Sequence, residues 1–574
     1  MNDQLQIFKG SLTWVRANPH NGASELLCLK HGQTKPELLI NDLGTALYNN
    51  SGGDYFVVGN RIYFATDKGR TVRILETKSC ETLIEASAKD SIARYGGFVG
   101  AVGHEAIYAV KEYGQDNSST RTAIVRLAMG TEEVLFEGAD FIAWLTIDEL
   151  ATRLAFCTWN HPTLPWEQTT LHELNLDKAG LRSRVIENSG YSIQQPLYSS
   201  EGILHWVSDA SGWWNIWRED NGLRENISPI QLDCARHKPF FGFRSYALSE
   251  NSNLLVTGVK GTQWYWKYCN HFNLIEEGAI GGAVQGVAYC SETEAFYILH
   301  STEADEIKII SVAVDGQVKN HYNYNQSPFK VIFEEIEIAD VSTSIYVPMG
   351  LPKAILVRIH GGPVGLSERK FDPEVTFWLE RQYIVVEPNY RGSIGKGRNY
   401  RLAIKGQWGI VDTEDCLSVI DKIGELLNQP KLPIYIEGKS AGGFTGLNCL
   451  RYESKVKAAA IYSGVTDLEL LNKRTHNLES NYVPWLVMRD SSSHIAERSI
   501  ILAVEEIRKP VVFLHGHKDY IVPIEQSISL MAELRARGRV CQLVDFSDEG
   551  HRFKNENNIW KALETTWQFF EQLD

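Results

Sequence analysis

The sequence predicts an all-β propeller of about seven blades over residues 1–326, followed by an α/β domain over residues 327–574 with helices on both faces of a mainly parallel sheet. Two observations lead to this fold class. The chain has 574 residues, about twice the length that a single hydrophobic core organises. Its first part consists of short strands and tight turns, whereas its second part alternates strands with helices.

The first part is rich in β-branched and aromatic residues, interrupted by Gly, Asn and Asp. Residues 54–58 and 61–65 read as one pair of strands, and residues 202–208 and 213–218 as another. This part also holds most of the 15 Trp residues. About 310 residues, at about 40–45 for each four-stranded blade, give about seven blades. An array of β-sandwiches is the alternative.

The second part contains near-continuous apolar strands separated by helical patterns. Such strands are typical of a parallel sheet that is buried on both faces, and reactive residues then lie at the carboxyl ends of the strands. The predicted strands are residues 354–359, 384–387, 434–437, 458–462, 511–514 and 542–546. The predicted helices are residues 413–427, 525–537 and 559–572.

Composition limits the partners. The net charge of −14 disfavours binding to nucleic acid or to an anionic membrane surface. No apolar stretch approaches the roughly 18 residues of a membrane helix, and the first residues show no signal-peptide pattern. The nine Cys residues are dispersed, without metal-binding spacing, which favours reduced thiols in the cytoplasm.

The main chemical signal is Gly438-Lys439-Ser440-Ala441-Gly442, which follows a predicted strand and precedes a helix-like segment. This is the nucleophile elbow of an α/β-hydrolase, and it specifies that fold for the second domain. The glycines allow a tight turn around a strained seryl residue. Ser440 is therefore the predicted nucleophile.

Two further strands end in residues that suit a catalytic triad. Asp519 follows the strand at residues 511–514, and His551 follows the strand at residues 542–546. Ser, Asp and His in this order are the α/β-hydrolase arrangement. We expect His551 to exchange a proton with Ser440, while Asp519 orients the imidazole.

An oxyanion hole requires backbone N–H groups close to the nucleophile. The turn His360-Gly361-Gly362-Pro363 follows an earlier strand and can place backbone where a side chain would not fit. We therefore assign the hole to the N–H groups of Ala441 and Gly362.

Three competing motifs are weaker. Gly438-Lys439-Ser440 resembles the end of a phosphate-binding loop, but Pro433 stands where that motif requires Gly. The glycines of residues 392–397 have the wrong spacing for a dinucleotide fingerprint. His515 and His517 could bind a metal, but no acidic or histidine pattern supports this. The sequence predicts neither a cofactor nor a metal.

Several strings beyond the elbow resemble the prolyl oligopeptidase family, in its acylaminoacyl-peptidase and aminopeptidase branch. In the second part they are His360-Gly361-Gly362-Pro363, Asn389-Tyr390-Arg391-Gly392-Ser393, Gln407-Trp408-Gly409 and Asp548-Glu549-Gly550-His551. In the first part they are Gly138-Ala139-Asp140-Phe141, Trp159-Asn160-His161-Pro162, Pro165-Trp166-Glu167 and Ser211-Gly212-Trp213-Trp214-Asn215. The resemblance implies a propeller that caps the hydrolase and restricts substrates to short peptides or small amides and esters.

The resemblance also suggests a substrate-binding residue. Glu479, in a stretch similar to one of this branch, could bind the α-amine of a substrate through a charge-assisted hydrogen bond. The alternative is a surface acid paired with Lys473 or Arg474. The chain departs from the branch at Asn49-Asn50-Ser51-Gly52-Gly53, where the branch usually has an acidic His-Glu-Tyr-Gly-Gly string, and this weakens the case for aminopeptidase specificity.

The sequence therefore predicts a cytoplasmic serine peptidase that cleaves short peptides from the N-terminus through an acyl-enzyme on Ser440. An amidase, esterase or acyl transferase acting on a modified peptide or small molecule is the second hypothesis. A catalytically dead propeller scaffold is the third. A homo-oligomer is compatible with all of them.

Overall fold

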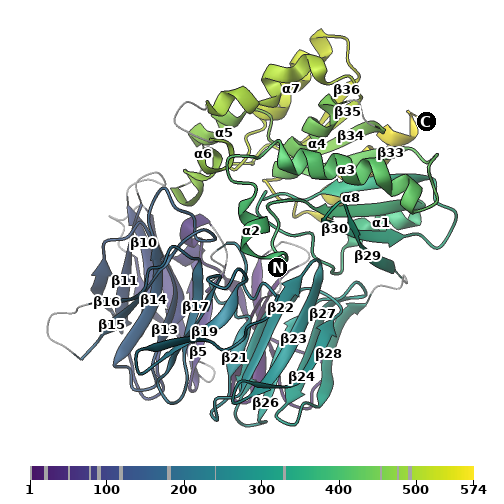
Figure 1. Ribbon diagram of the computed structural model, residues 1–574. Helices are drawn as coiled ribbons and strands as arrows, with labels where there is room; N and C mark the ends of the chain where they lie inside the picture. The colour runs from purple at the N-terminus through teal and green to yellow at the C-terminus, as the bar shows by residue number, and fades with distance from the viewer. Residues whose placement is uncertain are drawn as a thin grey trace. The chain divides into compact units, whose positions relative to one another are not determined.

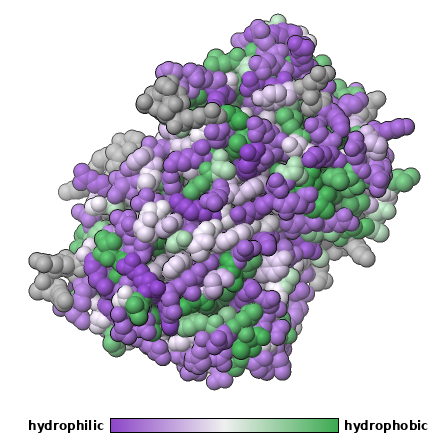
Figure 2. Space-filling view, in the orientation of Figure 1, coloured by the Kyte–Doolittle hydropathy of each residue, from purple (hydrophilic) through white to green (hydrophobic). Residues whose placement is uncertain are grey.

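The computed structural model describes residues 3–18, 23–49, 52–76, 79–86, 92–114, 120–177, 183–238, 241–326, 331–452, 455–474, 477–488 and 494–573. These residues form two compact units, one almost entirely from residues up to 326 and the other almost entirely from residues that follow. Hydrophilic side chains dominate the face shown in Figure 2, and apolar ones lie in separate patches. No helix of the described residues is long and apolar enough to span a membrane.

The first unit is a propeller of seven four-stranded antiparallel blades (Figure 1). Each blade is one continuous segment of chain, and the ring closes where β1 packs against β25. The strands are β1 (Asp3–Phe8), β2 (Ser11–Ala17), β3 (Ser24–Leu29), β4 (Glu37–Leu43); β5 (Tyr55–Val58), β6 (Arg61–Thr66), β7 (Thr71–Glu76), β8 (Ser79–Glu85); β9 (Ile92–Val99), β10 (Ile107–Gly114), β11 (Arg121–Ala128), β12 (Thr131–Glu137); β13 (Phe141–Ile147), β14 (Arg153–Trp159), β15 (Thr170–Asn175), β16 (Ser183–Glu187); β17 (Ile193–Tyr198), β18 (Leu204–Ser208), β19 (Asn215–Asp220), β20 (Leu223–Asn226); β21 (Tyr246–Leu248), β22 (Leu254–Lys260), β23 (Gln263–Asn270), β24 (Asn273–Ile280); β25 (Val284–Cys290), β26 (Ala295–His300), β27 (Asp305–Ala313) and β28 (Val318–Gln326).

Neighbouring blades are joined by tyrosine hydroxyls as well as by apolar packing. In two blades the inner strand has a bulge at a glutamine with positive φ, Gln4 in β1 and Gln195 in β17. Tyr55 and Tyr246, each from the following blade, donate hydrogen bonds to the buried backbone carbonyls of these glutamines. In a regular strand each of these carbonyl oxygens would accept a hydrogen bond from the neighbouring strand of its own sheet. The bulge leaves the carbonyl available to the tyrosine of the next blade.

The second unit contains an eight-stranded sheet with the order β29-β30-β32-β31-β33-β34-β35-β36. β30 runs antiparallel to both of its neighbours, β29 and β32, and all other neighbouring strands run parallel to each other. Their bounds are β29 (Ile332–Ile338), β30 (Val341–Val347), β31 (Ala354–Ile359), β32 (Tyr383–Asn389), β33 (Ile434–Lys439), β34 (Val456–Tyr462), β35 (Val511–Gly516) and β36 (Cys541–Phe546). The predicted fold class, a propeller followed by an α/β-hydrolase domain, is confirmed.

Helices cover both faces of this sheet, with α3 and α4 on one face and α1 and α8 on the other (Figure 1). The helices are α1 (Pro373–Glu380), α2 (Gly397–Leu402), α3 (Val411–Leu426), α4 (Ala441–Arg451), α5 (Leu468–Arg474), α6 (Tyr482–Val487), α7 (Glu525–Ala536) and α8 (Glu556–Glu571). The hairpin β29–β30 and the short helices α1, α2, α5 and α6 were not among the predicted elements. Helices of six to eight residues are too short to show a clear period of 3.6 residues.

Candidate active site

Ser440 lies in the turn between β33 and α4, with the unusual backbone angles φ 55° and ψ −119°. The turn is crowded: a Cβ atom on Gly442 would lie 2.1 Å from the carbonyl oxygen of Ile359. Only glycine fits there, which explains this part of the Gly-x-Ser-x-Gly pattern. The strained turn lifts the Ser440 side chain away from the sheet at the N-terminal end of α4.

The structure brings the three predicted triad residues together. His551 Nε2 lies 3.0 Å from Ser440 Oγ, and His551 Nδ1 lies 2.8 Å from Asp519 Oδ2. Asp519 and His551 follow the ends of the neighbouring strands β35 and β36. With Nδ1 protonated and facing the carboxylate, Nε2 can accept the proton of Ser440 as that residue attacks a carbonyl carbon.

Asp519 is buried, yet its surroundings favour the ionised form. Its Oδ1 accepts hydrogen bonds from the backbone N–H groups of Ile521 and Val522, at 3.0 and 2.8 Å. His515 Nε2 lies 3.4 Å from Oδ2. Burial would raise the pKa of Asp519, but the hydrogen bonds from His515, His551 and Val522 together hold that pKa well below its ordinary value.

The histidines that suggested a metal have other partners. His515 is fully buried and contacts Ser527 Oγ and the carbonyl oxygen of Val522, both at 2.8 Å. His517 is exposed and contacts Asp545 at 2.5 Å. Among the described residues no cluster of three or more His, Cys, Asp or Glu side chains is suited to hold a metal.

The predicted oxyanion turn packs directly against the elbow. A Cβ atom on Gly361 would lie 3.2 Å from Ser440 Cβ and 3.9 Å from the backbone nitrogen of Ala441. Gly362, with φ 132°, lines the same pocket as Ser440 and Ala441. The two predicted N–H donors therefore border the cavity into which the nucleophile opens.

Side chains that sequence reasoning did not single out hold this turn. The His360 ring stacks on Tyr390, with 4.3 Å between ring centroids, and its Nε2 lies 2.9 Å from Ser393 Oγ. Burial lowers the pKa of His360 to about 4, so the ring is neutral near pH 7. The Tyr482 hydroxyl accepts a hydrogen bond from the N–H of Val364 at 3.0 Å. The Asn-Tyr-Arg-Gly-Ser string could have pointed to this role.

A pocket that opens to solvent lies beside Ser440 in the second unit, with about 430 Å³ of empty space when the adjoining open solvent is counted. Its apolar walls come from Pro363, Trp408, Val465, Leu471, Tyr482, Val483, Leu486, Ile521 and Val522. Glu479, half-buried at the end of the turn η3 (Asn477–Glu479), is the one carboxylate among the described residues that line this pocket. Lys473 and Arg474, the partners of the surface hypothesis, contact Glu469 and Glu525 instead.

Two parts of the sequence-based hypotheses lie outside the described residues. They are residues 50 and 51, in the string that departs from the aminopeptidase branch, and residues 475 and 476, at the start of the stretch that contains Glu479.

Residues 369–573 match the model of the prolyl oligopeptidase family. Among curated proteins, the acylamino-acid-releasing enzyme of Arabidopsis thaliana is 24% identical over 262 residues, which cover 43% of this chain and 33% of that protein. Dipeptidyl-peptidase 5 of Aspergillus fumigatus is 26% identical over 255 residues, covering 40% of this chain and 33% of that protein. The chain thus spans about a third of the length of the curated relatives it matches.

Solved structures resemble the chain over its whole length. A puromycin-hydrolysing peptidase of Mycobacterium tuberculosis has a TM-score of 0.87 at 22% identity, and a puromycin hydrolase has a TM-score of 0.90 at 20% identity. Both alignments cover 100% of this chain and 94% of the other chain. At this level of identity the likeness establishes the fold.

Proposed function

Residues 369–573 belong to the prolyl oligopeptidase family, and from this premise we propose that the chain is a serine peptidase that removes residues from the N-terminus of short peptides. The observation that carries the proposal is the position of His551, within 3.0 Å of Ser440 Oγ and 2.8 Å of Asp519 Oδ2. A side chain that bridges a serine and a buried carboxylate in this way can transfer the proton that each half of an acyl-enzyme reaction requires.

In the proposed reaction Ser440 Oγ attacks the scissile carbonyl while its proton passes to His551 Nε2. The N–H groups of Ala441 and Gly362 stabilise the negative oxygen of the tetrahedral intermediate. His551 then gives its proton to the leaving amine, which departs and leaves an ester on Ser440. Water, deprotonated by the same imidazole, hydrolyses that ester and restores the hydroxyl.

Glu479 is the proposed contact for the free α-amine of the substrate. It is half-buried in the pocket that Ser440 borders, among apolar walls that suit an uncharged side chain. A carboxylate in such surroundings interacts more strongly with an ammonium group than an exposed carboxylate does. It would favour substrates with a free N-terminus over acylated ones.

Glu479→Gln tests this specificity because it keeps the shape of the side chain and removes its charge. Leaving a buried ammonium group without its partner typically costs 2–5 kcal/mol of binding free energy. The kcat/KM for aminoacyl substrates should therefore fall about 30-fold or more. N-acylated substrates carry no ammonium and should be cleaved at an unchanged rate. Glu469→Gln is the matched control, since Glu469 is exposed and pairs with Lys473 outside the pocket; an exposed pair contributes about 0–1 kcal/mol.

If Glu479→Gln changes the ratio of kcat/KM for aminoacyl substrates to kcat/KM for N-acylated substrates by less than twofold relative to wild type, the aminopeptidase specificity is wrong. The second candidate function, an amidase, esterase or acyl transferase acting on a modified peptide or small molecule, would then be preferred. Its support is the likeness in fold to structures described as puromycin hydrolases. A fluorophosphonate should label Ser440 if the protein has either of these two enzymatic functions. A catalytically dead scaffold would not be labelled.

A cytoplasmic location is also part of the proposal. All nine cysteines are free in the structure, and seven of them are buried. Free buried thiols are usual in a reducing compartment. Fractionation of cells that produce the full-length protein tests this location, and recovery from the extracellular or periplasmic fraction would contradict it.

A further inference from the structure

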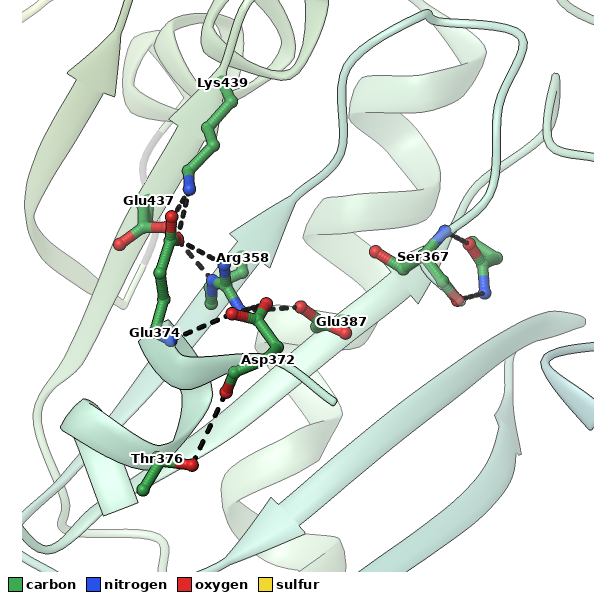
Figure 3. A network of polar contacts seen from close by, with 9 residues as sticks. Arg358, Ser367, Asp372, Glu374, Thr376, Glu387, Glu437 and Lys439 are labelled. Atoms are coloured by element: carbon green, nitrogen blue, oxygen red, sulfur yellow. Dashed lines mark hydrogen bonds and ion pairs between the residues drawn. The ribbon is translucent and has the colours of Figure 1, made fainter. Parts of the chain in front are cut away.

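A cluster of charged side chains lies at the carboxyl ends of three neighbouring strands, on the face of the sheet that α1 covers. Arg358 of β31 is buried between Glu387 of β32 and Glu437 of β33, 3.0 Å from each. The same guanidinium contacts Asp372 at 3.0 Å and Glu374 at 2.8 Å, at the start of α1. Figure 3 shows these carboxylates around Arg358.

The cluster also reaches the nucleophile elbow. Lys439, the residue immediately before Ser440, pairs with Glu374 and lies 3.7 Å from Glu437 (Figure 3). Arg358 and Glu437 are direct neighbours across the parallel strands β31 and β33. Their ion pair therefore fixes the register of the strand that leads to Gly362 relative to the strand that leads to Ser440.

Arg358 also lies just before the loop that carries the oxyanion turn and contacts the far end of that loop at Asp372. This loop, residues 360–372, begins two residues after Arg358 and ends at Asp372, which caps α1 by accepting a hydrogen bond from the N–H of Glu374 at 2.9 Å. Between these ends, Asn389 Oδ1 accepts a hydrogen bond from the N–H of Ser367 at 2.8 Å. The loop is thus fixed at its start, middle and end.

The stability of the folded protein does not by itself explain why Arg358 and its carboxylate partners are buried together. Apolar residues of similar volume often stabilise a core as well as buried ion pairs do. A planar guanidinium with several fixed partners, however, restricts the geometry of the groups around it. The residues it restricts here belong to the two strands and the loop from which the nucleophile and an oxyanion donor come.

We propose that Arg358 is a positioning residue of the hydrolytic reaction, which sets the N–H of Gly362 at the correct distance from Ser440 by holding the loop 360–372 and the strand β33 together. The inference rests on the proposed function, because it concerns the oxyanion hole of that reaction. A donor that is misplaced by a fraction of an ångström still allows substrate to bind, but it stabilises the transition state less.

Two variants test the proposal. Arg358→Lys keeps the positive charge but cannot reach carboxylates on all sides, and Asp372→Asn keeps the helix cap but breaks the ion pair at the far end of the loop. Arg381→Lys is the matched control: Arg381 follows α1 and pairs with Glu564, away from the loop. Active sites are counted by titration with a fluorophosphonate, so that kcat refers only to folded, reactive enzyme.

We expect kcat per titrated site to fall about 10- to 100-fold in Arg358→Lys and about 3- to 10-fold in Asp372→Asn, with KM within about threefold of wild type. The inhibition constant of a peptide boronic acid, whose tetrahedral adduct places an oxygen in the oxyanion hole, should rise by the same factor as kcat/KM falls. The inhibition constant of the product peptide, which forms no such adduct, should not change. Arg381→Lys should leave all these values unchanged.

A merely structural role for Arg358 predicts fewer titrated sites and a lower melting temperature, with wild-type kcat per site, and this result would overturn the proposal. A loss of kcat without a matching loss of boronic acid affinity would also overturn it. If Arg358→Lys does not fold, Asp372→Asn alone decides between the two roles. If wild-type protein shows no labelling of Ser440, the proposed function fails, and this failure is distinct from a failure of the inference.

Discussion

Replacing Asp519 with asparagine should change the protonation of His551 without changing the shape of the site. Oδ1 of Asp519 accepts two backbone hydrogen bonds, from Ile521 and Val522, so the amide oxygen of the variant should take that place. The amide NH₂ then occupies the position of Oδ2, 2.8 Å from His551 Nδ1. Because an NH₂ group only donates, Nδ1 must accept, and the proton of the neutral imidazole moves to Nε2.

In this tautomer Nε2 faces Ser440 Oγ with a proton and cannot accept another. Asparagine in place of a triad aspartate costs about 10⁴ in kcat, which corresponds to about 5 kcal/mol of transition-state stabilisation. We expect a fall of this size in Asp519→Asn, with KM within about threefold, because the pocket that binds substrate keeps its walls.

The assay is steady-state hydrolysis of an aminoacyl chromogenic substrate, with circular dichroism to show that the variant is folded. Asp545→Asn is the control, since Asp545 contacts His517 in a similar Asp–His pair that is exposed and lies outside the pocket. A loss below tenfold in Asp519→Asn, or an equal loss in Asp545→Asn, would refute the role assigned to Asp519.

Two further predictions concern the stability and precision of the site. Burial, together with repulsion by Asp372 and Glu437, raises the pKa of Glu387 from 4.5 to about 7 although Arg358 opposes the shift. The folded state therefore binds this proton more tightly than the unfolded state, and the free energy of unfolding should fall, by up to about 3 kcal/mol, as the pH rises from about 4.5 to above 7. Glu387→Gln should lose this pH dependence in urea denaturation, and a variant with the same pH dependence as wild type would contradict the assignment. Tyr482→Phe should lower kcat about tenfold, because it leaves the N–H of Val364 in the oxyanion turn without its acceptor; an unchanged kcat, measured on titrated sites, would show that the turn is fixed without this bond.

The fold class and the proximity of the triad residues could be predicted because they depend on short-range patterns. In a parallel sheet the carboxyl ends of the strands share one edge, so residues just after three strands had to lie near one another. Ser440, Asp519 and His551 could thus be placed together from their positions after strands alone.

The groups that hold the site could not be predicted in the same way. Arg358 and Glu387 are each the one charged residue of an apolar strand, and Glu437 shares β33 with Lys439 alone. Their cluster appears only when β31, β32 and β33 are adjacent. The order β32-β31-β33 cannot be read from the sequence. The position of Glu479 in the pocket depends likewise on short helices and a 3-10 turn that have no clear periodicity.

The central claim, that Ser440 and His551 act as one catalytic unit, is tested most directly by comparing Ser440→Ala, His551→Ala and the double variant in one assay of kcat. Either change alone removes proton transfer or the nucleophile, so each should lower kcat by about 10⁶, and the double variant should be only slightly slower. Losses that multiply in the double variant, or a Ser440→Ala protein that keeps its activity, would show that the reaction takes another course.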